Sequence, residues 1–279
     1  MAERKRPQPR RAIVLRTERI TPHMIRVTLG GEGLADFPAG AYTDHYVKIL
    51  FAADGGALPE PLDLEALRES LPREEWPRTR TYTVRGWNPT AQELAIDFVH
   101  HGDEGLAGPW AARAQPGDVL YFSGPGGGYT PDPAADWHLL VGDESALPAI
   151  AAGVERLPVG ATAHVFVEVA DAEEEQKLDT YGAAEIRWVH RGDRPIGEAL
   201  LEAVRGLEFP AGRVHAFVHG EATFVKDMRR ELFIERGVPR AGQSISGYWR
   251  RGADEDGWQS SKSEWNRQVE EDEAKAASA

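Results

Sequence analysis

The stretch Pro77–Arg85, PRTRTYTVR, carries side chains that suit a flat, phosphorylated ligand. β-Branched and aromatic residues alternate with Arg and Thr, which predicts a strand with Arg80 and Tyr82 on one face and Thr81 and Thr83 on the other. An aromatic face stacks on a flat ring, a guanidinium forks onto a phosphate, and hydroxyls donate to ring heteroatoms. A flavin nucleotide meets all of these demands. The alternative, which the spacing supports equally, is a barrel strand whose arginines face water.

A second candidate is the Gly-rich stretch His100–Trp110, which follows a predicted strand. If Gly108–Arg113 opens a helix, its free N–H groups form an anion site, and small residues at Gly105 and Ala107 let a diphosphate approach the backbone. The alternative is an ordinary strand–helix connection. The adjacent histidines at its start point to opposite faces of a strand, so we expect no metal site there.

The stretch Gly142–Ile150, GDESALPAI, lies where a strand passes into a helix. Nucleotides bind at such turns in doubly wound folds, although Asp143 and Glu144 could equally be capping groups. Glu168 and Asp171 end the next predicted strand, where an acid that bonds a ribose favours NADH over NADPH. A fourth stretch, Gly247–Gly252, pairs two aromatic residues with two arginines, which suits a flavin ring and an anion or, alternatively, the packing of a terminal strand between domains.

Six predicted strands with little helix between them would position the first two stretches, which favours an antiparallel barrel or sandwich. They cover Ala12–Arg19, His23–Leu29, His45–Phe51, the Arg80 strand, Leu94–His100 and Val119–Phe122. A polar insertion at residues 52–76 holds a helical turn at Leu62–Ser70.

From about residue 135, strands alternate with helices, which predicts βαβ units around a mostly parallel sheet. The strands are Trp137–Gly142, Ala163–Val169, Glu185–His190 and Val214–Gly220, and the helices are Ser145–Leu157, Gly197–Gly206 and Glu221–Arg236. We place an N-terminal β-barrel domain at 11–132, an α/β domain at 133–247, and an aromatic strand with an acidic helical tail at 248–279, its helix running from Ser263 to about Lys275.

The composition narrows the chemistry. The 279 residues contain no cysteine, which removes disulfides, thiolate-held metal centres and cysteine nucleophiles, so redox work requires a bound organic cofactor. The net charge of -13 disfavours nucleic acid as a partner. We find no apolar run near the ~20 residues of a membrane span and no apolar signal core, and we expect a cytoplasmic monomer.

Four motifs in fixed order carry a family resemblance. They are Arg80-x-Tyr82-Thr83-x-Arg85, Asp97-Phe98-Val99-x-His101-Gly102, Gly142-Asp143-Glu144-x-Ala146-Leu147-Pro148-Ala149-Ile150 and Gly247-Tyr248-Trp249-Arg250-x-Gly252. Together they resemble the siderophore-interacting proteins, flavin-dependent ferric-siderophore reductases of the ferredoxin reductase-like superfamily. The resemblance implies an FAD-binding barrel followed by a nucleotide-binding α/β domain.

The resemblance also implies site residues. FAD would contact Arg80, Thr81, Tyr82, Thr83, Asp97, Phe98, Val99, His101, Gly102, Gly105, Ala107, Gly108, Tyr248 and Trp249. The nicotinamide nucleotide would lie near Asp143, Glu144, Ser145 and Ala146, and the anionic ferric siderophore would contact Lys48 and Arg251. Gly108 departs from the family pattern, which often has a hydroxyl residue at about this place, so one phosphate bond is expected to be absent or replaced.

The activity implied is the transfer of electrons from NADH or NADPH through FAD to siderophore-bound Fe(III), with ferredoxin open as another donor. No acid–base residue is needed for that core chemistry, because the cofactor supplies it. Two alternatives stay open: a general flavin or ferric reductase, and a non-catalytic flavoprotein that binds ferric chelates.

Overall fold

The computed structural model describes residues 8–277. Two compact units divide these residues. The first contains the chain up to Ala41 together with His45–Gly127, and the second contains Tyr42–Asp44 together with the chain from Gly128 onward.

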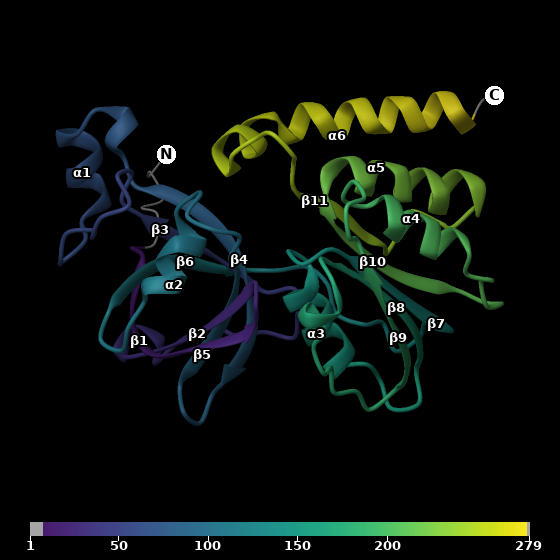
Figure 1. The fold of residues 1–279 in the computed structure, drawn as a ribbon, viewed down its shortest axis with the longest axis horizontal. Helices are drawn as coiled ribbons and strands as arrows, with labels where there is room; N and C mark the ends of the chain where they lie inside the picture. The colour runs from purple at the N-terminus through teal and green to yellow at the C-terminus, as the bar shows by residue number, and fades with distance from the viewer. Residues whose placement is uncertain (1–7, 278–279) are drawn as a thin grey trace, which may run out of the picture. The chain divides into compact units, whose positions relative to one another are not determined.

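A closed antiparallel barrel forms the first unit, with strand order β1-β2-β5-β4-β3-β6 (Figure 1). The strands are β1 Arg10–Thr21, β2 Met24–Gly30, β3 Tyr46–Phe51, β4 Arg78–Asn88, β5 Glu93–Val99 and β6 Val119–Gly126, with a short 3-10 turn, η1, at Glu32–Leu34. The predicted barrel and its six strands are confirmed.

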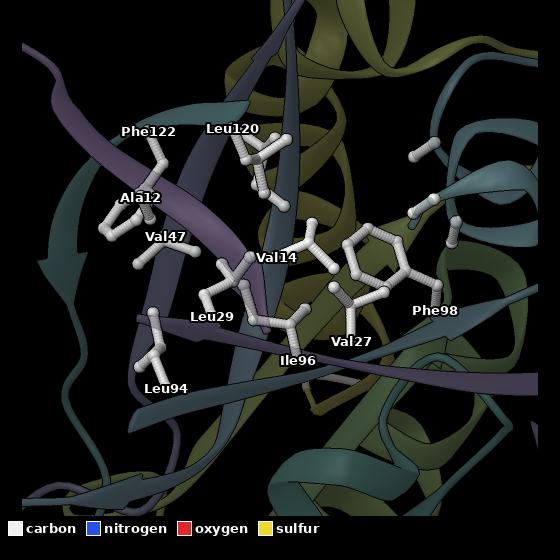
Figure 2. Packing of buried hydrophobic residues seen from close by; sticks show 14 of the residues in the cluster. Ala12, Val14, Val27, Leu29, Val47, Leu94, Ile96, Phe98, Leu120 and Phe122 are labelled. Atoms are coloured by element: carbon white, nitrogen blue, oxygen red, sulfur yellow. The ribbon is translucent and has the colours of Figure 1, made fainter. Parts of the chain in front are cut away.

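Alternation along the strands builds the core of the barrel, because every second side chain points inward. Val14, Val27, Leu29, Ile96 and Phe122 are almost fully buried, and Figure 2 shows such side chains converging inside the barrel. Burying each one stabilises the fold by roughly 1.5–3 kcal/mol. Helix α2, Ala107–Arg113, adds its own buried alanines to this core.

The insertion between β3 and β4 holds helix α1, Leu64–Ser70, and the 3-10 turn η2, Arg73–Glu75. The N-terminus of α1 is capped by Asp63, whose carboxylate accepts from the backbone N–H groups of Glu65 and Ala66 at 3.0 Å each. No residue of α1 is buried, so this insertion has little core of its own.

A parallel five-stranded sheet forms the second unit, in the order β11-β10-β7-β8-β9. The strands are β7 Trp137–Gly142, β8 Thr162–Val169, β9 Ala183–His190, β10 Val214–Glu221 and β11 Ser244–Trp249. The connecting segments hold α3 Leu147–Glu155, the 3-10 turn η3 Ala172–Glu174, α4 Glu198–Arg205, α5 Ala222–Arg230 and a π-helical turn, η4, Glu231–Glu235. This confirms the predicted α/β architecture; α3, however, begins two residues later than expected, after a tight turn at Gly142–Ala146.

Helix α6, Glu255–Ala277, begins eight residues before the predicted start at Ser263. Its buried residues Trp258, Val269 and Glu273 follow helical spacing and form its packing face. Glu273 accepts two hydrogen bonds from Arg229 of α5 at 2.6 and 3.0 Å. Between residues 8 and 277, no helix combines the length and the apolar character that crossing a membrane requires.

Candidate functional site

Strand β4 places Arg80 and Tyr82 on the barrel's inward face, because they pair with the buried residues Ile49 and Val47 of β3. The ring of Tyr82 lies 4.4 Å from that of Phe98, centroid to centroid, at 36°. Arg80 and Tyr82 are both half-buried. The predicted sharing of a face is therefore confirmed, and the phenol ring is held by an aromatic neighbour while part of it stays accessible.

The outer face of the same strand pair presents a cation among hydroxyls. Lys48 lies opposite Thr81 on β4 and opposite Ser123 on β6, and its side chain is exposed. Thr83 lies two residues beyond Thr81 on this face and is buried. The barrel thus brings Lys48 and Thr81 together, although they are 33 positions apart in sequence, and the sequence did not predict this contact.

Asp97 has a partner that sequence reasoning missed. It pairs across the ladder with Arg26, whose guanidinium donates to both carboxylate oxygens at 2.6 and 2.8 Å. Arg85 also lies within 3.9 Å of the carboxylate. Asp97 is 3% exposed and its neighbour Phe98 is fully buried, so both stabilise the barrel whatever else they contact. The signal for Arg26 was a lone cation within the apolar run Met24–Leu29.

The loop before α2 presents open backbone. Gly102 and Gly105 have φ angles of +92° and +82°, and a Cβ on either would meet nothing within 4 Å. Helix α2 then begins at Ala107, and no side chain caps it. A helix therefore does form here, beginning at Ala107 and not at Gly108, and its first N–H groups have no side-chain cap.

Gly108 has a packing reason to depart from the expected hydroxyl residue. A Cβ at this position would lie 3.0 Å from the carbonyl oxygen of Val99 and 3.6 Å from the Cα of His100. A side chain here would push α2 away from β5. Glycine at position 108 therefore allows the helix and the strand to pack closely, and no hydroxyl is available there.

In the second unit, the buried carboxylate of Asp143 accepts several hydrogen bonds. Its carboxylate accepts from Ser145 N at 2.9 Å, Ser145 Oγ at 2.5 Å, Glu221 N at 2.9 Å and Trp249 Nε1 at 2.9 Å. Burial raises the pKa of this carboxyl above its ordinary value, and the donors oppose the rise. Four donors leave little of the carboxylate for a ligand, so Asp143 holds together the ends of three strands.

Glu144 and Glu168 share Arg191. The guanidinium lies 3.1 Å from Glu144 and 3.5 Å from Glu168. Glu168 is fully buried and also accepts from the backbone N–H of Gly197 at 3.0 and 3.1 Å. Burial raises the pKa of both carboxyls, and Arg191 opposes the rise. Of the two acids suggested for a ribose, only Asp171 is exposed.

The turn between β7 and α3 is tight. A Cβ on Gly142 would lie 2.5 Å from the Cβ of Ala146 and 2.6 Å from the carbonyl oxygen of His219. Ala146 is fully buried, whereas Ser145 is partly exposed. The short side chains at this turn therefore serve close packing of the backbone at the carboxyl end of the sheet.

A second buried acid, Glu221, holds the end of β11 and the residues that follow it, and the sequence did not predict this role. Glu221 accepts from the backbone N–H of Arg251 at 3.2 Å, and it caps α5 through Thr223 N at 2.6 Å and Phe224 N at 3.2 Å. The Tyr248 ring lies 4.6 Å from that of His219. Asp143 and Glu221 therefore hold Trp249 and the Arg251 backbone in place, while the Arg251 side chain is exposed. An acid directly before a helix was the available signal.

Histidines line one face of β7 and β10. His138, His215 and His219 are buried, and burial lowers their pKa values, to about 4 for His138 and about 3 for His219. Tyr129 stacks on His215 at 4.9 Å. These rings are neutral packing elements at neutral pH.

Models of known protein families match both parts of the chain. Residues 13–129 match the family model described as siderophore-interacting FAD-binding domain, and residues 135–252 match the model described as siderophore-interacting protein.

Three relatives align with this chain over nearly the whole of their own length. An uncharacterized protein of Mycobacterium tuberculosis is 46% identical, covering 94% of this chain and 95% of the relative. The ferric vibriobactin reductase ViuB of Vibrio cholerae is 35% identical, covering 92% and 94%. The NADPH-dependent ferric-chelate reductase of Escherichia coli is 30% identical, covering 86% and 92%.

Solved structures agree. The siderophore-interacting protein SipS of Aeromonas hydrophila superposes with a TM-score of 0.78 at 31% identity, covering 93% of this chain and 98% of SipS. A ferredoxin-NADP+ reductase of Plasmodium falciparum shares the fold alone, with a TM-score of 0.62 at 10% identity, covering 86% and 96%.

Proposed function

The chain belongs to the siderophore-interacting protein family, and we propose on that premise that it is a reductase of siderophore-bound Fe(III). FAD is its cofactor and NADH or NADPH its donor. FAD, when bound, takes an electron pair from a nicotinamide and passes electrons singly to an acceptor. Reduction weakens the iron complex, because Fe(II) binds hard oxygen ligands less tightly than Fe(III) does.

The residues of the barrel fit FAD. Tyr82 offers a partly accessible ring, Arg80 on the same strand face offers a guanidinium for phosphate, and α2 offers an uncapped N-terminus beside open backbone at Gly102 and Gly105. The observation that carries the proposal is this set within one barrel whose sequence matches an FAD-binding family model.

The remaining contacts are proposals. Tyr248 and Trp249 would contact the cofactor, and Lys48 and Arg251 would attract the anionic chelate. Because Asp143 already receives four hydrogen bonds, we propose that it positions Trp249 and that the nucleotide meets the exposed parts of Glu144 and Ser145. A monomeric state and a cytoplasmic location stay predictions, as does ferredoxin as another donor.

The experiment is a visible spectrum of the purified protein, followed under anaerobic conditions by NADH, by NADPH and then by a ferric siderophore. We expect a flavin band that a nucleotide bleaches and that the ferric chelate restores, with the faster nucleotide identifying the donor. A band that neither nucleotide bleaches would favour another donor or a binding role. Absence of a band after FAD is added would reject the proposal.

A further inference from the structure

A hollow of about 560 Å³ lies in the second unit, between helix α6 and the elements that α6 packs against. Its walls come from α5, η4, the loop before β11, β11 itself and the C-terminal half of α6. Figure 1 shows α6 running along α5 in this unit. Small-molecule sites in proteins have volumes of roughly 300–1,000 Å³, so the hollow has room for a ligand. None of its lining residues is among those proposed for FAD, the nicotinamide nucleotide or the siderophore.

A guanidinium in the wall keeps hydrogen-bond donors for a ligand. Arg229 donates to both oxygens of the buried Glu273 carboxylate at 2.6 and 3.0 Å, which occupies its fork. Arg240 donates to the same carboxylate through Nη1 alone. In the part of the chain that the structure describes, Nε and Nη2 of Arg240 have no hydrogen-bond partner, and the side chain is 48% exposed. Arg240 therefore offers two N–H edges to the hollow.

A carboxylate in the wall is also unpaired. Glu270 lies one turn before Glu273 on α6 and is exposed. Among residues 8–277 its carboxylate has neither a hydrogen-bond partner nor an ion pair, so it does not neutralise Arg240. A simple anion bound at Arg240 would be repelled by Glu270, and a simple cation bound at Glu270 would be repelled by Arg240. A ligand that carries both charges satisfies both groups.

The rest of the wall is apolar. Phe233 and Ile245 are half-buried, and Ala274 lies on the exposed side of α6. The guanidinium of Arg240 lies 4.6 Å from the ring centroid of Phe233, so the charged and apolar walls adjoin. An apolar group placed there is removed from water, which favours binding. The ligand that fits carries its apolar group close to its carboxylate.

We infer that this hollow binds a free α-amino acid with a large apolar side chain. The carboxylate of the ligand accepts from Arg240, its ammonium donates to Glu270, and its side chain contacts Phe233 and Ile245. The end of a peptide chain carries only one of these two charges, so a free amino acid fits better. The inference does not rest on the proposed function, because the second unit alone builds the hollow.

The first test measures the binding of L-phenylalanine by a ligand-observed NMR titration of the full-length protein. We expect Arg240→Gln and Glu270→Gln each to raise the dissociation constant at least fivefold. Arg230→Gln and Glu271→Gln are the matched controls, since both residues are exposed neighbours outside the lining, and they should stay within twofold of the wild type. No detectable binding to the wild type, or equal losses in the controls, would overturn the inference.

The Arg240→Gln variant should keep its fold, because Arg229 still donates to both oxygens of Glu273 and α6 stays anchored. The circular dichroism spectrum and the midpoint of urea unfolding check this. A second measurement on the wild type needs no substitution. N-Acetyl-L-phenylalanine lacks the ammonium, L-phenylalanine amide lacks the carboxylate, and glycine lacks the apolar side chain. We expect each to bind at least fivefold more weakly than L-phenylalanine. Equal affinity for any one of them would reject the zwitterion site.

A third measurement locates the bound amino acid. The ligand would join Glu270 of α6 to Arg240 in the loop before β11, so it should hold α6 against the unit. We expect saturating L-phenylalanine to slow amide hydrogen exchange across residues 264–276 in the wild type and not in Arg240→Gln. Exchange in α6 that is unchanged by the bound ligand would place the amino acid elsewhere and reject the inference.

Discussion

The indole N–H of Trp249 donates to the buried carboxylate of Asp143 at 2.9 Å, across 106 positions of sequence. This bond joins the end of β11 to the end of β7. The same carboxylate receives the N–H of Glu221, and Glu221 receives the N–H of Arg251. Two residues that the family resemblance assigns to cofactor and substrate are thus held by two buried acids.

Replacing Asp143 with Asn should loosen this arrangement. An amide group turns an N–H toward one of the four donors, and an unsatisfied buried donor costs about 1–3 kcal/mol. We expect the free energy of unfolding in urea to fall by that amount and the near-ultraviolet circular dichroism of tryptophan to change. Trp249→Phe keeps a ring without the donor, so in the double variant the two losses should not add. Additive losses would contradict the coupling.

Tyr82 should contribute to flavin affinity through its ring. We expect Tyr82→Ala to raise the dissociation constant of FAD about tenfold, since a stacked aromatic pair contributes roughly 0.5–1.5 kcal/mol beyond the area it buries. Tyr82→Phe keeps the ring and should bind FAD nearly as the wild type does. Tyr181 is 78% exposed in the second unit, so Tyr181→Ala is the control. FAD affinity unchanged in Tyr82→Ala would reject the stacking role.

Asp97 should act mainly on stability. Asp97→Asn leaves Arg26 without its charged partner in a nearly buried pair, and breaking such a pair costs about 3 kcal/mol. Urea unfolding would measure the loss of stability. The dissociation constant of FAD, measured without denaturant, should stay within a few-fold of the wild-type value. A large loss of FAD affinity with unchanged stability would instead identify Asp97 as a cofactor contact.

Lys48 should act on the chelate and not on FAD. We expect Lys48→Ala to raise KM for an anionic ferric siderophore about three- to tenfold at low salt, with FAD content unchanged and with the effect shrinking as salt screens the charge. Lys177, whose side chain is 89% exposed on the second unit, provides the control Lys177→Ala. An unchanged KM at low salt would remove Lys48 from substrate attraction.

Acid should destabilise the second unit through its buried histidines. Burial lowers the pKa of His138 to about 4, whereas an unfolded histidine titrates near 6.5. Below pH 6.5 the unfolded chain binds a proton at this histidine and the folded chain does not. The contribution of neutral His138 to the free energy of unfolding is therefore fully present above pH 6.5. It falls toward pH 4 by up to about 1.4 kcal/mol per pH unit.

His138→Phe tests this directly, because neither ring nitrogen of His138 has a hydrogen-bond partner within the part of the chain that the structure describes. Urea unfolding between pH 6.5 and 4.5 should show a shallower pH dependence in this variant. His190→Phe, at an exposed histidine paired with Glu175, is the control for replacing a histidine with phenylalanine. Equal slopes in wild type and His138→Phe would contradict the prediction.

The sequence by itself determined the architecture and the order of the motifs. Period-two alternation around Tyr82 sets which side chains share a face, and strands separated by helices specify a parallel sheet; both are local patterns. The start of α2 near Gly108 was readable for the same reason. The predicted start of helix α6 at Ser263 is too late. Trp258 joins the packing face of the helix only through its contact beside Gly247, which a local sequence pattern does not encode.

Only the tertiary structure decided which polar groups are already engaged. The sequence predicts Asp97 and Asp143 as ligand contacts, yet their hydrogen-bond partners lie 71 and 106 positions away in sequence. Those partners are brought to them by the order of the strands in each sheet. Register and chain crossing set such contacts, and a carboxylate's chemistry is the same in sequence whether it meets a ligand or an arginine of its own chain.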